Sequence, residues 1–140
     1  MTEIWPEMAE IPGLRIYKNS WFAKFARKER ISDAALCDAI DRATHGLIDA
    51  DLGSGLIKQR VAREGAGKSG GYRTLIFFRA GERSIFVFGF AKSDKENLDA
   101  EELAEFKKAA RELLKFSQQQ VAALVEIGRL IEVKRGEEDL

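Results

Sequence analysis

The sequence predicts an α+β fold in which one antiparallel sheet carries helices packed on one side. Three strand-like runs rich in Val, Ile, Phe and Tyr occupy the middle of the chain, at residues 56–62, 72–80 and 84–91. Segments with apolar residues three and four apart, which is the helical spacing, lie before and after these runs. Residues 80–83 are short enough for a hairpin turn, so the last two runs should pair antiparallel.

The chain is expected to form one domain over residues 13–140, after an N-terminal extension of residues 1–12. A length of 140 residues suffices for one hydrophobic core but not for two. The single Cys cannot form an internal disulfide, which fits a reducing compartment. No N-terminal signal pattern is seen, and no apolar run reaches the roughly 18 residues of a membrane span. We therefore expect a soluble, cytoplasmic protein without membrane contacts.

Polar residues mark the starts of the two N-terminal helices. Asn19 or Ser20 would cap a helix over residues 21–30, and Ser32 or Asp33 would cap the second. Both caps can accept a hydrogen bond from a backbone N–H of the first helical turn.

The helical pattern returns after the strands. Apolar residues from Leu98 to Leu114 line one face of a long helix, and residues 121–127 repeat the pattern. Residues 130–133 fit either a last short strand or the end of that helix. With a short strand at residues 14–18, the expected order is strand, two helices, three strands and two helices.

Positive charge is concentrated in residues 58–92, although the whole chain has 23 basic and 23 acidic residues. This window holds eight Lys or Arg and only two Glu. A local cationic field attracts phosphate, and RNA is the commonest polyphosphate of a cell. Strand alternation places Lys58 and Arg60 on one face of their strand, and Arg73 can join them from the next. With Lys92, they would form one open basic site.

Residues 62–69 offer a competing interpretation, because they satisfy the loose phosphate-loop pattern with Ala62 in place of its first glycine. Such a loop needs a helix directly after it, since the helix N-terminus supplies part of the phosphate field. Here Gly70, Gly71 and a strand-like run follow instead. The segment is therefore better interpreted as a hairpin loop, either with an incidental lysine or as a basic loop that closes on a nucleic-acid backbone.

Three motifs together resemble a known family. They are GLIKQRVAR at residues 55–63, GKSGGYR at 67–73 and FGFAK at 88–92. Over roughly residues 14–134 the chain resembles the RelE/HigB-type toxins of bacterial type II toxin–antitoxin modules. The resemblance implies a RelE-like, microbial-RNase-type antiparallel sheet. It also implies a ribosome-dependent mRNA endonuclease (an mRNA interferase) that inhibits translation by cleaving through the ribose 2′-hydroxyl.

The resemblance also implies roles for individual residues. Arg73 matches the arginine that stabilises the transition state, because a guanidinium fork suits two phosphoryl oxygens. The implied catalytic residues are Lys58, Arg60, Arg73 and Lys92. The implied RNA-binding residues are Arg63, Lys68 and Tyr72, although a tyrosine in this position is more often a cross-strand packing residue.

No cofactor or metal is expected. The chain has one His and one Cys, and its basic window contains no carboxylate cluster that could hold an ion. The partners implied by the resemblance are a cognate antitoxin, often with a helix-turn-helix domain, together with the ribosome and mRNA. DNA would be contacted only through the complex with the antitoxin.

The sequence departs from better-known members of the family after Lys92. Ser93 stands where the family would have an arginine that acts as the general acid. The next helix also has no tyrosine that could stack on an RNA base. Phe88 or Phe90 could stack, or both could pack in the core, and we expect Phe86 to share their face. These departures leave an alternative function, a non-catalytic RNA- or partner-binding protein on the same fold.

Four further residues have simple structural interpretations. Arg79 and Arg83 flank the hairpin and are expected to be solvated turn charges. His45 lies near a helix end, where it would cap a carbonyl or face solvent. Cys37 lies on an apolar helix face and is expected to be a small core residue.

Overall fold

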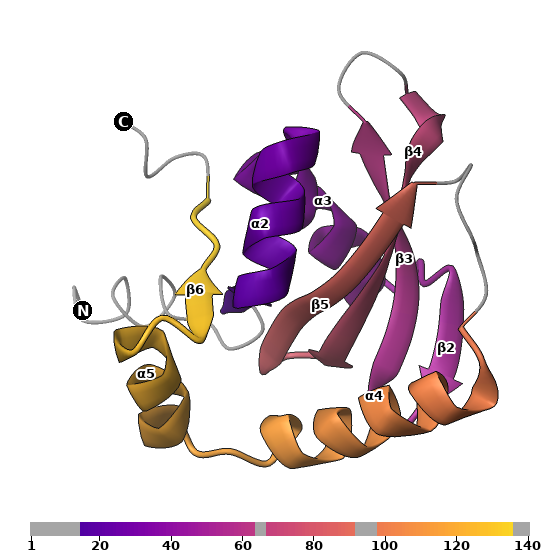
Figure 1. Cartoon of the computed structure of the whole chain (residues 1–140). Coiled ribbons are helices and arrows are strands. Elements are labelled where there is room, and N and C mark those ends of the chain that lie inside the picture. The colour runs from indigo at the N-terminus through magenta and orange to yellow at the C-terminus, as the bar shows by residue number, and fades with distance from the viewer. Residues whose placement is uncertain (1–14, 64–66, 92–97, 136–140) are drawn as a thin grey trace, which may run out of the picture.

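The computed structural model describes residues 15–63, 67–91 and 98–135, without the side chains of residues 67–70. A six-stranded, mostly antiparallel sheet and four helices form an α+β fold, which confirms the predicted class (Figure 1). The elements are β1 (Ile16–Asn19), α2 (Ser20–Glu29), α3 (Asp33–Thr44), β2 (Ala50–Gly53), β3 (Leu56–Arg63), β4 (Gly67–Arg79), β5 (Arg83–Ala91), α4 (Ala100–Leu114), α5 (Gln118–Glu126) and β6 (Leu130–Glu132). The expected N-terminal extension lies outside the described residues.

The strands lie in the order β2-β3-β4-β5-β1-β6. Strands β2 to β5 form an antiparallel meander, whereas β1 pairs parallel with β5 and antiparallel with β6. The predicted hairpin between β4 and β5 is present, and Gly81 supplies its left-handed residue with φ of 79°. For residues 130–133 the sequence allowed either a short strand or the end of a helix, and the structure has strand β6 at the first three of them.

Strand β2 was missed from the sequence. Its residues, Ala, Asp, Leu and Gly, have low strand propensity, and the strand is held by pairing with β3 rather than by its own composition.

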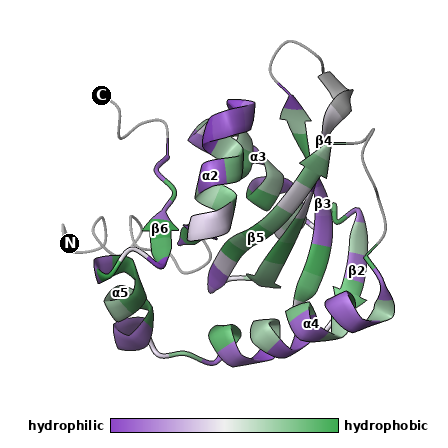
Figure 2. Ribbon diagram, in the orientation of Figure 1, coloured by the Kyte–Doolittle hydropathy of each residue, from purple (hydrophilic) through white to green (hydrophobic). Residues whose placement is uncertain are grey.

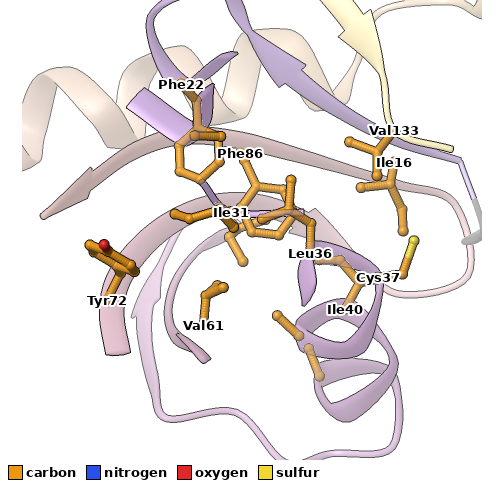
Figure 3. Packing of buried hydrophobic residues seen from close by; sticks show 14 of the residues in the cluster. Ile16, Phe22, Ile31, Leu36, Cys37, Ile40, Val61, Tyr72, Phe86 and Val133 are labelled. Carbon is orange, nitrogen blue, oxygen red and sulfur yellow. The ribbon is translucent and has the colours of Figure 1, made fainter. Parts of the chain in front are cut away.

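Helices cover both faces of the sheet, so the expectation that they pack on one side is wrong in this detail. Helices α2 and α3 bury one face, where Leu36 and Ile40 meet Ile57 and Ile76. Helices α4 and α5 bury part of the other face. Figure 2 shows long apolar stretches in the central strands and helices of mixed hydropathy around them, and Figure 3 shows the packing of the first cluster. The physical reason is that the central strands carry apolar residues at consecutive positions, which makes both faces apolar.

A β-bulge at Val87 changes which phenylalanines share a face. Leu75 pairs with Phe88 but Ile76 pairs with Phe86, so one extra residue is inserted in β5. Phe86 therefore joins the cluster under α2, whereas Phe88 packs in the cluster on the α4 side. The expected common face for Phe86, Phe88 and Phe90 is wrong, because simple alternation does not survive a bulge.

Polar caps fix both N-terminal helices, as the sequence predicted. The Asn19 side chain accepts a hydrogen bond of 2.8 Å from the N–H of Phe22, and Ser32 Oγ accepts one of 3.1 Å from Ala35. At its other end α2 stops at Arg30, whose φ of 59° and ψ of 44° are left-handed. This backbone conformation favours glycine, so Arg30 carries a conformational cost.

Arg30→Gly should therefore raise the free energy of unfolding by about 0.5–1 kcal/mol, because glycine adopts this conformation without a Cβ clash. Urea denaturation of the two proteins measures the difference. Arg27→Gly, at a position inside the same helix, is the control and should lower stability by roughly 1 kcal/mol. An Arg30→Gly protein less stable than the parent would contradict the assignment of strain to this residue.

Arg83 is not a solvated turn charge, contrary to expectation. It is 8% exposed, and its guanidinium donates hydrogen bonds of 2.9 Å to the carbonyls of Leu113 and Phe116 at the end of α4. Burial lowers the pKa of this guanidinium. Arg79 behaves as expected, since it is exposed and pairs with Glu82 at 3.3 Å. Arg83 thus ties the β4–β5 hairpin to the link between α4 and α5.

Arg83→Met should lower the free energy of unfolding by about 2–3 kcal/mol, because two carbonyls lose a charged donor. The matched variant Arg79→Met, across the same hairpin, should change stability by no more than about 0.5 kcal/mol, since exposed ion pairs contribute little. Chemical denaturation of both variants checks this, and equal effects would show that the Arg83 contacts do not stabilise the fold.

Candidate functional site

Two arginines face each other across the centre of the sheet. Arg60 of β3 lies directly opposite Arg73 of β4, and Lys58 lies opposite Leu75 in the next pair but one. Alternation puts all three cations on the face that α4 covers only in part, since Leu56, Leu75 and Phe77 of that face lie in the α4 cluster. The structure therefore brings together three of the four predicted catalytic residues. We call Lys58, Arg60 and Arg73 the cationic face.

The cationic face has no compensating carboxylate in the part of the chain that the structure describes. None of its three side chains forms an ion pair there. Asp49 accepts a hydrogen bond of 2.6 Å from the backbone N–H of Arg60, not from its side chain. Like charges directly opposite in a sheet destabilise it. An arginine pair without a counterion among the described residues is chemically suited to an external anion.

Buried polar residues on the reverse side hold these strands in register. The Gln59 side-chain amide donates to the carbonyls of Ala39 and Leu47, both at 3.0 Å, and its oxygen accepts from the N–H of Asp49 at 2.9 Å. Thr74 Oγ1 donates to the carbonyl of Gln59 at 2.8 Å. Gln59 and Thr74 alternate with Arg60 and Arg73, so they fix the backbone from which the cations project.

Gln59 and Thr74 were not singled out from the sequence. Their signal was present: each is a polar residue at a position that alternation assigns to the apolar face, and buried polar groups of this kind are hydrogen-bonded.

A glycine lets the two strands approach closely just before the arginine pair. A Cβ placed on Gly71 would collide with the carbonyl of Val61 on β3. Residue 71 must therefore lack a side chain where β3 shifts register between Val61 and Arg63. This explains the Gly-Tyr-Arg order of the motif.

An aromatic group borders the cationic face on β5. Phe90 lies opposite Arg73, and its ring centroid is 6.2 Å from that of Phe88. The Phe88 ring also contacts Trp21 at 4.7 Å and Phe106 at 5.7 Å. Of the two open interpretations, packing describes Phe88, because three other rings surround it.

Comparison with protein families agrees with this geometry. The family model described as RelE toxin of RelE / RelB toxin-antitoxin system matches residues 14–133, which is most of the chain. The chain belongs to the RelE toxin family. A search of curated proteins finds none that matches.

Membership makes the protein a toxin of a toxin–antitoxin system, with a cognate antitoxin as its partner. Toxins of the RelE family are generally endoribonucleases. No helix in the described ranges is long and apolar enough to cross a membrane. Within the same ranges, no group of three or more His, Cys, Asp or Glu could hold a metal ion.

Two of the residues predicted to bind RNA lie on the opposite face of this RelE-type sheet. Tyr72 is buried among the residues under α2, as Figure 3 shows, and its hydroxyl donates to Glu29 Oε1 at 2.8 Å. Burial, followed by this hydrogen bond, raises the pKa of Tyr72. The Arg63 guanidinium lies 5.8 Å from the centre of the Tyr72 ring, on the same side. Tyr72 is therefore a packing residue of the toxin and does not lie on the cationic face.

The other sequence predictions concern the residues around Lys92 and the phosphate-loop pattern. Lys92 and Ser93, with the side chain of Lys68, lie outside the described residues. Residues 67–79 form β4, so no helix follows the phosphate-loop pattern, and that interpretation is wrong.

The simple interpretations of His45 and Cys37 are confirmed. His45 is exposed, and its Nδ1 is 2.7 Å from the carbonyl oxygen of Asp41. Cys37 is buried in the cluster under α2.

Proposed function

We propose that this RelE-type toxin is a metal-independent endoribonuclease that cleaves translated mRNA on the ribosome. The observation that carries the proposal is the pairing of Arg60 with Arg73 without a counterion among the described residues. Two arginines paired across adjacent strands can hold a phosphate and the extra charge that develops on it during reaction. Phosphate is also the anion that an mRNA carries between every two successive nucleotides.

The proposed reaction is attack of a ribose 2′-oxygen on the adjacent phosphorus. A bond forms from the 2′-oxygen to phosphorus, and the bond from phosphorus to the 5′-oxygen breaks, which leaves a 2′,3′-cyclic phosphate. The 2′-hydroxyl loses a proton and the 5′-oxygen gains one. Arg73, half-buried between Arg60 and Phe90, is suited to stabilise the charge on the phosphoryl oxygens.

Lys58 and Arg60 lie two residues apart on β3, and they extend the positive charge around Arg73 along this strand. They would neutralise the phosphate and its neighbour, and the lysine is the candidate to exchange a proton with the attacking oxygen. Lys92 is proposed as a further phosphate ligand or proton donor, from the resemblance alone. The ribosome would supply the alignment of the mRNA that an open strand face lacks.

Expression of the toxin from an inducible promoter, with and without its antitoxin, tests this function. We expect growth arrest without the antitoxin and new mRNA 5′ ends within translated frames. Purified toxin should cut a messenger only when ribosomes translate it. A harmless toxin would favour the alternative of a non-catalytic RNA- or partner-binding protein. Cleavage that does not depend on translation would instead contradict the proposed action on the ribosome.

A further inference from the structure

A second cationic site lies on the reverse side of the ribbon formed by β3 and β4. A hollow of about 340 Å³ is lined by Lys28, Glu29, Arg30, Arg63 and Tyr72. Its cations come from three places: Lys28 lies in the last turn of α2, Arg30 is the left-handed residue that ends this helix, and Arg63 is the last residue of β3. Two of the lining residues, Arg63 and Tyr72, were predicted from the sequence to bind RNA, and none of the five belongs to the cationic face.

The charge in this hollow is not neutralised within the described ranges. Lys28, Arg30 and Arg63 make no ion pair there. The one carboxylate of the lining, Glu29, accepts the hydrogen bond of Tyr72. The Arg63 guanidinium lies over the Tyr72 ring, a contact that orients it without neutralising it. The hollow therefore attracts an anion.

A neighbouring hollow of about 220 Å³ shares Arg30 and Arg63 with the first. Its other walls are Ile31, Ala35 and Ala62, which are apolar, and Ser32. A nucleotide has the same division into a charged phosphate and a flat, largely apolar base. The first hollow suits the phosphate, and the second suits the base or ribose attached to it.

We infer that these two hollows bind one nucleotide of RNA, with its phosphate held by Lys28, Arg30 and Arg63. The inference rests on the proposed function, because it adds a second contact for the RNA that the toxin engages. Arg63 follows Arg60 by three residues on β3, and Tyr72 precedes Arg73 on β4. The two sites thus lie on opposite faces of the ribbon formed by β3 and β4. An RNA chain held at the cationic face can therefore continue around this ribbon to the second site.

The left-handed backbone of Arg30 supports this assignment. A glycine would suit the position better, yet an arginine occupies it and lines both hollows. Strained residues of this kind cluster at ligand sites. Arg30→Gly is consequently a useful probe, since it removes the cation and relieves the backbone at once.

Binding of a fluorescein-labelled, fully 2′-O-methylated oligonucleotide, which cannot be cleaved through a 2′-hydroxyl, tests the inference. Anisotropy titrations at several salt concentrations should show roughly tenfold weaker binding by Arg30→Gly and by Lys28→Gln. The slope of log K against log salt should fall by about 0.7 for each, as for one lost phosphate contact on a single strand. Arg27→Gln, in the same helical turn but outside both hollows, should bind within twofold of the parent.

Co-sedimentation with ribosomes is the second arm, and it separates messenger from ribosomal RNA. Weaker oligonucleotide binding identifies the messenger as the source of the nucleotide, whereas weaker ribosome binding alone identifies ribosomal RNA. Unchanged affinity in both arms overturns the inference, and so does a loss of antitoxin affinity alone, which would mark a protein-docking site. The Arg73→Ala variant keeps the two proposals apart: if it loses cleavage while Arg30→Gly binds RNA normally, the proposed function stands and this inference fails.

Discussion

Arg73→Ala should abolish growth arrest and slow mRNA cleavage by a factor of about 10²–10³. Arg73 lies opposite Arg60 on the face that α4 covers only in part, and its guanidinium fork can donate two parallel hydrogen bonds to one phosphate. Its loss removes stabilisation of charge that develops in the transition state. Arg73→Lys should recover only part of the rate, because an ammonium group restores the charge but not the fork. Single-turnover cleavage of ribosome-bound mRNA measures both variants.

Arg79→Ala is the matched control for this experiment. Arg79 lies on the same strand and, by alternation, on the same face, but it is exposed beside the hairpin and paired with Glu82. The control should cleave at the parental rate. An Arg73→Ala protein that is folded, shown by an unchanged melting temperature, and still fully toxic would refute the catalytic assignment of Arg73.

Gln59→Leu should lower the free energy of unfolding by about 3 kcal/mol or more. Leucine has a similar size, but it leaves the carbonyls of Ala39 and Leu47 and the N–H of Asp49 without their partner. Each buried group without a hydrogen bond costs about 1–3 kcal/mol. Urea denaturation at pH 7 measures the loss, and cleavage at a temperature where the variant is folded measures any change in the register of Arg60.

Gln119→Leu provides the comparison, because Gln119 is an exposed residue of α5. Its substitution should change stability by less than about 0.5 kcal/mol. If the two variants were equally stable, the buried amide would not be what holds β3 against α3 and the segment before β2.

The sequence predicted the placement of three basic residues on one face better than it predicted their surroundings. Alternation along two regular strands was enough to place Lys58, Arg60 and Arg73 on one face, because β3 and β4 have no irregularity between residues 56 and 61. The same argument failed on β5, where a bulge at Val87 reverses the alternation. Nothing in a run of Val and Phe residues marks the position of such an insertion.

Other errors came from contacts that are distant in the sequence. Arg83 lies in a hairpin, where arginines are commonly solvated, but the carbonyls that it binds come 30 and 33 residues later. Tyr72 meets α2 rather than the cationic face, because its partner Glu29 lies 43 residues earlier in the chain. Arg63 lies over the Tyr72 ring on the same side. Local pattern determines which face a residue takes, but not what the rest of the chain brings to that face.

The pairing of Arg60 with Arg73 also couples the folding of the toxin to the anions around it. Two like charges across adjacent strands repel, so the folded protein alone is less stable than its packing would allow. Any polyanion or acidic segment that binds there relieves the repulsion, and a ligand that binds only the folded state adds stability by mass action. The unliganded toxin is therefore the form most exposed to unfolding and proteolysis. The same charges that are proposed to attract RNA would limit the lifetime of the toxin on its own.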